Sequence, residues 1–137
     1  MRIFKNTAIV WVLALLLGFT ACEPEPTTIP DEDYRDDFIG TWLADDSPAK
    51  STLNTYVVTI SKDPSNSAQL LLNNFHQTQQ NVSGLVSASR ITISGFSTNA
   101  GSISGEGKLI GNNKIQWDYS VNDGADIIEY SAVFTRR

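Results

Sequence analysis

The chain has 137 residues, with 10 Lys and Arg against 15 Asp and Glu, which gives a formal net charge of −5 at pH 7. This negative balance argues against nucleic acid as a partner, because phosphate backbones attract basic proteins. One cysteine and one histidine exclude an intramolecular disulfide and a zinc site built from nitrogen and sulfur ligands, and we expect no cofactor.

Residues 1–21 have the composition of a secretory signal peptide. Arg2 and Lys5 supply positive charge, Ala8–Phe19 is an apolar run of twelve residues, and small residues precede Cys22. Twelve residues are too few to cross a hydrocarbon core, which takes about 20 in a helix. We therefore expect cleavage before Cys22, which becomes the lipidated first residue of the mature chain. The alternative is an uncleaved helix with an incidental cysteine.

Residues 22–37 are expected to form an acidic, lipid-anchored tether. They hold seven acids beside Arg35, and three prolines, so they have too few apolar groups to bury and should stay extended. The tether serves either as a spacer or as an export signal. Glu23 differs from the aspartate that favours inner-membrane retention in enteric bacteria, so we expect the cell envelope and the outer membrane, with surface exposure as an open alternative.

Residues 38–137 have the pattern of a small all-β domain. In the segment around Val58, apolar residues at positions 56, 58 and 60 face one way, and this period of two predicts a half-buried strand. No segment after Trp42 has helical periodicity. In chain order we expect one helical turn at Tyr34–Asp37 and strands at Phe38–Leu43, Asn54–Lys62, Ala68–Phe75 with a kink at residues 73–74, Val82–Ala88 and Arg90–Ser94 with Ile91 and Ile93 inward.

The last third predicts two hairpins. Lys114–Val121 and Ile127–Thr135 alternate cleanly, and a two-residue loop at residues 123–124, or a four-residue loop centred there, would join them. This loop pairs Trp117 with Tyr130. The inward residues are then Ile115, Trp117, Tyr119 and Val121 on one strand, and Ile128, Tyr130, Ala132 and Phe134 on the other.

The preceding hairpin is expected to turn at residues 111–113, with Asn113 in a left-handed conformation. This register places Gly107 opposite Trp117 and Gly105 opposite Tyr119, so that each ring covers a glycine. About eight short strands joined by short turns favour an antiparallel up-and-down meander that forms a closed or nearly closed barrel.

Several segments carry a resemblance to the small lipocalin-like (calycin-type) lipoproteins of Bacteroidota, which are mostly uncharacterised. They are Cys22 with its signal sequence, Tyr34–Trp42, Ile103–Gly107, Trp117–Ala125 and Tyr130–Thr135. Gly40-Thr41-Trp42 is similar to the lipocalin Gly-x-Trp signature. The resemblance implies that Trp42 closes one barrel end and stacks with Arg136 or Arg137. The domain is shorter than a lipocalin and lacks the helix after the barrel. The expected barrel-closing core is Gly40, Trp42, Trp117, Tyr119 and Tyr130.

The sequence favours a non-catalytic binding or interaction module that works through its exposed loops at 45–51, 63–67 and 76–81. Its partner would be an envelope protein or a glycan. The alternative is a lipocalin-like carrier of a small apolar ligand, although the inward aromatic side chains should fill a barrel of this size. Catalysis is not expected, since His76 lies in a polar loop where solvation is anticipated and no nucleophile-elbow pattern occurs.

The outward positions of the last three strands carry carboxylates. The expected registers place Glu106 near or opposite Asp118, and Asp118 opposite Glu129. Opposed like charges are destabilising, so neighbouring lysines, water or a cation should compensate them. A weak Ca²⁺ site at Glu106, Asp118 and Glu129 is the functional alternative, although Ca²⁺ takes 6 to 8 oxygen ligands.

Overall fold

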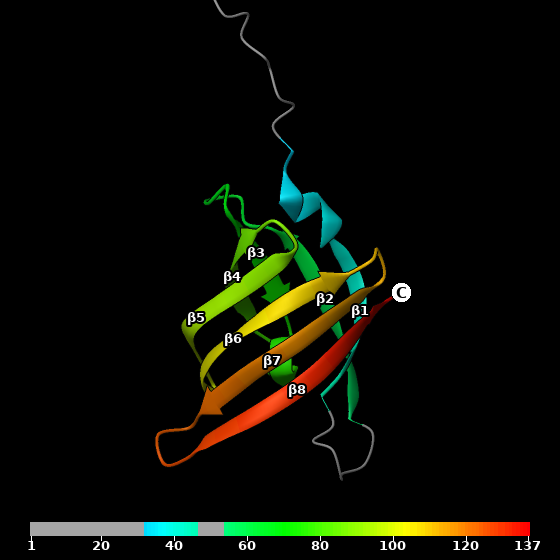
Figure 1. Ribbon diagram of the computed structural model, residues 1–137. Coiled ribbons are helices and arrows are strands. Elements are labelled where there is room, and N and C mark those ends of the chain that lie inside the picture. The colour runs from blue at the N-terminus through cyan, green and yellow to red at the C-terminus, as the bar shows by residue number, and fades with distance from the viewer. Residues whose placement is uncertain (1–31, 47–53) are drawn as a thin grey trace, which may run out of the picture. The chain divides into compact units, whose positions relative to one another are not determined.

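A computed structural model describes residues 32–46 and 54–137, and Figure 1 shows their strands as one β-barrel. The signal peptide, Cys22, most of the tether and residues 47–53 lie outside the described residues. The elements are η1 (Tyr34–Asp37), β1 (Gly40–Asp45), β2 (Thr55–Lys62), β3 (Gln69–Asn73), η2 (Phe75–Gln77), β4 (Asn81–Ser87), β5 (Arg90–Thr98), β6 (Gly101–Ile110), β7 (Lys114–Asn122) and β8 (Ile127–Arg136).

The strands follow one another around the barrel in chain order, all antiparallel, and β8 pairs with β1. The prediction of an all-β, up-and-down closed barrel is therefore confirmed. The closing contact with β1 covers Val133–Arg136 of β8, whereas Ile127–Ala132 pair with β7 alone.

Apolar side chains at alternate strand positions build the barrel core. The predicted inward residues of β2 and β5 are buried, as are those of β7. The largest side chains with almost no exposure are Trp42, Trp117, Tyr119, Phe38, Phe75 and Phe134. The core is thus aromatic.

The predicted register of the β6–β7 hairpin is confirmed. Gly107 pairs with Trp117 and Gly105 with Tyr119. A Cβ added at Gly107 would lie 2.5 Å from Cε2 of Trp117, so the ring packs directly against the glycine backbone. The left-handed turn residue was wrongly predicted: Gly111 adopts it, with φ of +60°, and Asn113 does not.

The predicted register of the β7–β8 hairpin is wrong by two residues. Trp117 pairs with Ala132, and Tyr119 pairs with Tyr130. The loop comprises the four residues 123–126, one position later than expected, because the Asp123 carboxylate accepts hydrogen bonds from the backbone nitrogens of Ala125 and Asp126, both at 2.9 Å. Local side-chain bonding of this kind fixes a turn that hydrophobic alternation does not specify.

Two further boundaries differ from the expected ones. β3 ends at Asn73, because Asn74 is left-handed with φ of +66°, so Phe75 leaves the sheet. β5 runs on to Thr98 through an irregularity between Ile93 and Phe96.

Residues 32–37 belong to the same compact unit as the barrel. Ion pairs fix these residues to the end of β2, since Nζ of Lys62 lies 2.8 Å from Oδ2 of Asp33 and 2.7 Å from Oδ1 of Asp36. Nη2 of Arg35 lies 2.7 Å from Oδ2 of Asp33. The expected turn at Tyr34–Asp37 is present as a 3-10 helix whose N-cap is Asp33.

The barrel has two distinct ends. The Trp42 end carries η1, the β2–β3, β4–β5 and β6–β7 turns and the C-terminus. The His76 end carries η2, the β5–β6 and β7–β8 turns, and residues 46 and 54.

Candidate functional site

A stacked pair closes the Trp42 end. The Trp42 ring is fully buried, its Nε1 donates to the Phe38 carbonyl at 2.9 Å, and the Arg136 guanidinium carbon lies 4.2 Å from the ring centre. The lipocalin resemblance implied such a stack with Arg136 or Arg137, and Arg136 forms it. A cation over an indole face is favoured by the ring quadrupole.

The guanidinium of Arg136 also joins three segments. Nη1 donates to the Ile39 carbonyl at 2.7 Å, Nη2 to the Asp37 carbonyl at 2.6 Å and Nε to the Asn112 carbonyl at 2.7 Å. A Cβ added at Gly40, whose φ is +137°, would lie 3.0 Å from Nη1. Glycine therefore makes room for the arginine as well as permitting the backbone angle.

A groove of about 450 Å³ lies beside this stack. All three guanidinium nitrogens of Arg136 donate to backbone carbonyls. The lining residues of the groove are Asp36, Asp37, Leu109, Gly111, Asn112 and Arg136.

At the His76 end, the connection between β3 and β4 folds into the barrel. We call Asn74–Gln80 the interior segment. Phe75 is fully buried, with its ring centre 4.8 Å from that of Trp117 and 5.0 Å from that of Tyr119, both in edge-on geometry. The interior of the barrel is therefore occupied by a side chain from the chain's own loop.

The interior segment has an unusual backbone. Asn74, His76, Gln77 and Gln79 all have φ between +52° and +66°, a region that residues other than glycine visit uncommonly. The Asn74 side chain supports the turn, since Nδ2 donates to the Val57 carbonyl at 2.9 Å and Oδ1 accepts from the Gln79 nitrogen at 3.1 Å. Surrounding structure must hold such conformations in place.

A polar network supplies part of that support. The Asp46 carboxylate, 2% exposed, accepts hydrogen bonds from the Tyr119 hydroxyl at 3.2 Å and from Nδ2 of Asn54 at 3.1 Å. Nδ1 of His76 lies 2.8 Å from the Tyr119 hydroxyl and 3.3 Å from the carboxylate. The His76 backbone nitrogen donates to the Tyr56 hydroxyl at 3.1 Å. We call Asp46, Asn54, Tyr56, His76 and Tyr119 the polar network.

The network keeps a buried carboxylate ionised. Burial alone would raise the pKa of Asp46, but hydrogen bonds from His76 and Tyr119 outweigh it and leave the pKa below its usual value. Burial, followed by the charge of neighbouring groups, raises the pKa of Tyr56 and of Tyr119. At neutral pH the two hydroxyls are therefore neutral donors beside an ionised acceptor, which is the pairing that a buried charge needs.

The expectation that His76 is a solvated loop residue is wrong. Its side chain is 18% exposed, and its ring packs edge-on against Tyr130 at 4.7 Å. Asp46 and Tyr56 are further members of this site that the sequence did not mark as functional. The signal available was the run of Asn and Gln around Phe75, since Asn tolerates left-handed backbone.

Among the predicted core residues, Tyr119 and Tyr130 stack at 5.2 Å with an interplanar angle of 12°, beside the interior segment. The Trp117 ring packs edge-on against the ring of Phe75. The indole nitrogen Nε1 of Trp117 is buried without a hydrogen-bond partner in the described structure.

The expected carboxylate row on the outer wall forms only in part. Glu106 lies directly opposite Asp118 in the β6–β7 register. Arg90 forms an ion pair with Glu106. Asp118 lies opposite Ser131, whereas Glu129 lies opposite Ser120, because the β7–β8 register is shifted. The arrangement of carboxylates predicted for the alternative Ca²⁺ site at these three residues is therefore wrong. The described residues hold no cluster of three or more His, Cys, Asp or Glu suited to a metal ion.

No protein-family model and no curated protein matches the chain. A solved structure of a redesigned β-barrel is similar to it, with a TM-score of 0.53 and 10% sequence identity, covering 77% of this chain and 96% of that chain. At this identity the likeness concerns the fold alone. Fold and site together define the class as a small closed antiparallel β-barrel with an internally occupied core. Within residues 32–46 and 54–137, no helix is long and apolar enough to span a bilayer.

Proposed function

We propose that the chain is a lipid-anchored lipoprotein of the cell envelope whose barrel acts as a non-catalytic binding or interaction module. The anchor is supported by the sequence pattern that ends at Cys22. The single observation that favours an external binding surface is the fully buried ring of Phe75 inside the barrel. A ligand would have to displace this ring before it entered the core.

The Trp42–Arg136 stack supports a finer proposal, that the chain is related to the lipocalin-like lipoproteins of Bacteroidota. Outer-membrane localisation belongs to the same proposal.

Carriage of a small apolar ligand is the second candidate, and one observation favours it. The buried Nε1 of Trp117 lacks an acceptor, and an unsatisfied buried donor costs about 1–3 kcal/mol. A ligand with an acceptor atom would satisfy this donor if the interior segment moved aside.

The anchor is tested by Cys22→Ser. The variant should accumulate as unprocessed or soluble protein, whereas the natural chain partitions into membranes. A serine variant that is fully cleaved yet still found in membranes would refute the lipoprotein proposal. Protease shaving of intact cells, followed by mass spectrometry of the released peptides, then reports whether the barrel faces outward.

The two binding proposals are separated by native mass spectrometry of the purified full chain, alongside pull-downs from envelope extract. A retained apolar molecule supports carriage. A protein or glycan that is retained by the natural chain supports the interaction module.

A further inference from the structure

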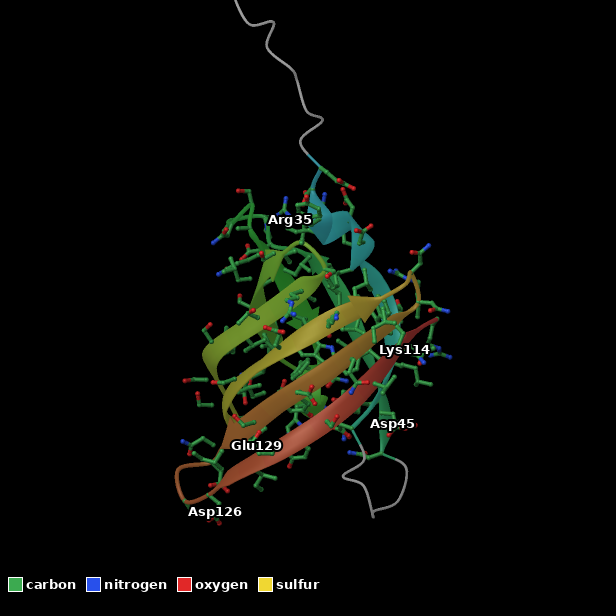
Figure 2. The ribbon with its side chains drawn as sticks, viewed as in Figure 1. Arg35, Asp45, Lys114, Asp126 and Glu129 are labelled. Carbon is green, nitrogen blue, oxygen red and sulfur yellow. The ribbon has the colours of Figure 1, made fainter. Side chains whose placement is uncertain are left out.

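Charge is distributed unevenly between the two ends of the barrel. Every described Lys and Arg lies in the half of its element nearer the Trp42 end or, for the last residue, just beyond that element: Arg35, Lys62, Arg90, Lys108, Lys114, Arg136 and Arg137. Figure 2 shows Arg35 near the top of the barrel and Lys114 on the right above Asp45, with Glu129 and Asp126 at the lower left. Acids at the Trp42 end thus have Lys or Arg nearby, whereas the described part of the His76 end holds no Lys or Arg.

The acids of the His76 end are not equivalent. Asp46 belongs to the polar network, and Asp123 is engaged by the backbone of its own turn. The ion pairs within the described residues include neither Asp126 nor Glu129. These two carboxylates begin and end the sequence Asp126-Ile127-Ile128-Glu129, which we call the hairpin tip.

Both isoleucines of the hairpin tip are exposed. Ile127 is 65% exposed, the largest fraction among the large apolar side chains of the described residues, and Ile128 is 48% exposed. Ile128 occupies an inward position of β8, opposite the buried Val121, but it lies beyond the packed core. Neighbouring apolar side chains that burial within the domain does not explain are typical of interaction surfaces.

We propose that the hairpin tip is a docking surface for a basic segment of an envelope protein, in which Lys or Arg side chains flank at least one apolar side chain. This proposal rests on the interaction module proposed above and names the chemistry of its partner. Apolar side chains of the partner would cover Ile127 on the outer face of the hairpin and Ile128 on its inner face, while flanking cations would pair with Asp126 and Glu129. Such complementarity gives specificity and speeds association.

The same charges disfavour other occupants. A second copy docking tip to tip would bring like carboxylates together, which is repulsive. An anionic lipid surface and nucleic acid would be repelled for the same reason.

The test uses the purified full chain in a neutral detergent and a labelled pentapeptide of alternating Lys and Leu, blocked at both ends. Fluorescence anisotropy measures its affinity at low salt, after subtraction of a titration with detergent alone. We expect saturable binding that weakens as salt is added. A pentapeptide with Glu in place of Lys should not bind, and one with Ser in place of Leu should bind more weakly.

Two matched pairs of substitutions locate the site. Asp126→Asn with Glu129→Gln should weaken binding about tenfold, which corresponds to about 1.4 kcal/mol. Glu32→Gln with Asp118→Asn removes the same net charge elsewhere and should leave the affinity within about twofold. Ile127→Ser with Ile128→Ser should weaken binding without changing its salt dependence. Thermal melts check that each variant remains folded.

An equal loss in both charge pairs would show non-local attraction and would overturn the proposal. The proposal would also be overturned if the variant with Ile127→Ser and Ile128→Ser bound the lysine peptide as tightly as the natural chain does. It would likewise be overturned if the natural chain did not bind this peptide. None of these results bears on membrane anchoring or on retention of another partner, which are measured separately, so failure of the docking surface is distinguishable from failure of the proposed function.

Discussion

The guanidinium carbon of Arg136, at the end of β8, lies 4.2 Å from the ring centre of Trp42 on β1, so the cation stacks on the face of the indole. The arginine also donates to three carbonyls from separate segments. Arg136→Ala should therefore lower the free energy of unfolding by about 2 kcal/mol, through loss of the cation–π contact and of charge-assisted hydrogen bonds. Urea unfolding measures this loss.

Arg136→Lys retains the charge but not the planar fork, so it should restore only a small part of the loss. Arg137→Ala is the control, because this neighbouring side chain is exposed. Equal effects at both positions would contradict the assignment of closure to Arg136.

Phe75→Ala should lower the free energy of unfolding by about 3–5 kcal/mol, the usual result of removing a fully buried aromatic ring. The variant loses edge-on contacts with Trp117 and Tyr119. Gln77→Asn is the control, since Gln77 is exposed and Asn accepts left-handed backbone. If Phe75→Ala unfolds at the same urea concentration as the natural chain, the interior segment does not fill the barrel in solution.

Gly107→Val should destabilise the barrel strongly, by about 3 kcal/mol or more, because overpacking forces the Trp117 ring from its place. The added Cβ alone would meet Cε2 of Trp117 at 2.5 Å. Gly111→Asn is the matched control, since nothing lies within 4 Å of its added Cβ and Asn tolerates its φ of +60°. A similar thermal melt for both glycine variants would refute the packing of Trp117 on β6.

The lowered pKa of Asp46 predicts a specific pH dependence. Its ionised form is favoured in the folded state, so its contribution is fully present above the unfolded pKa, about 3.9, and is lost as the pH falls through the folded value. Urea unfolding of the natural chain and of Asp46→Asn between pH 7 and pH 3 isolates this contribution. The difference between them should shrink toward low pH, because Asp46 becomes protonated. Asp33 and Asp123, whose pKa values are also lowered, act equally in both proteins, so their contributions cancel. Parallel loss of stability in the two proteins would contradict the network.

Hydrophobic alternation predicted most of the barrel. It identified the inward faces of β2, β5 and β7 and the β6–β7 register, because a one-residue slip would turn every core side chain outward. The β7–β8 register depended instead on where Asp123 bonds to its own turn. A shift of two residues keeps the same faces inward, so alternation could not detect it.

The candidate site was harder to predict, because its members are distant in sequence. Asp46 and Tyr119 meet across 73 positions, and His76 joins them from a connection between strands. A polar run ordinarily indicates a solvated loop. Here Phe75 is buried in the barrel core, so the polar residues around it also lie close to the interior. The partners that satisfy their polar groups come from distant parts of the chain and are seen only in the tertiary structure.

Closure by β1 and β8 also constrains how the chain reaches this structure. The bond from Arg136 to the Ile39 carbonyl joins residues 97 positions apart, so the first strand cannot complete its pairing until the last strand is available. Contacts of such long sequence separation slow folding, since the loop entropy is lost before the contacts form. The Phe75 ring must enter before or during this final closure. Folding of the barrel should therefore be a late, cooperative event that requires the entire domain, and a chain truncated before β8 should not retain a stable partial barrel.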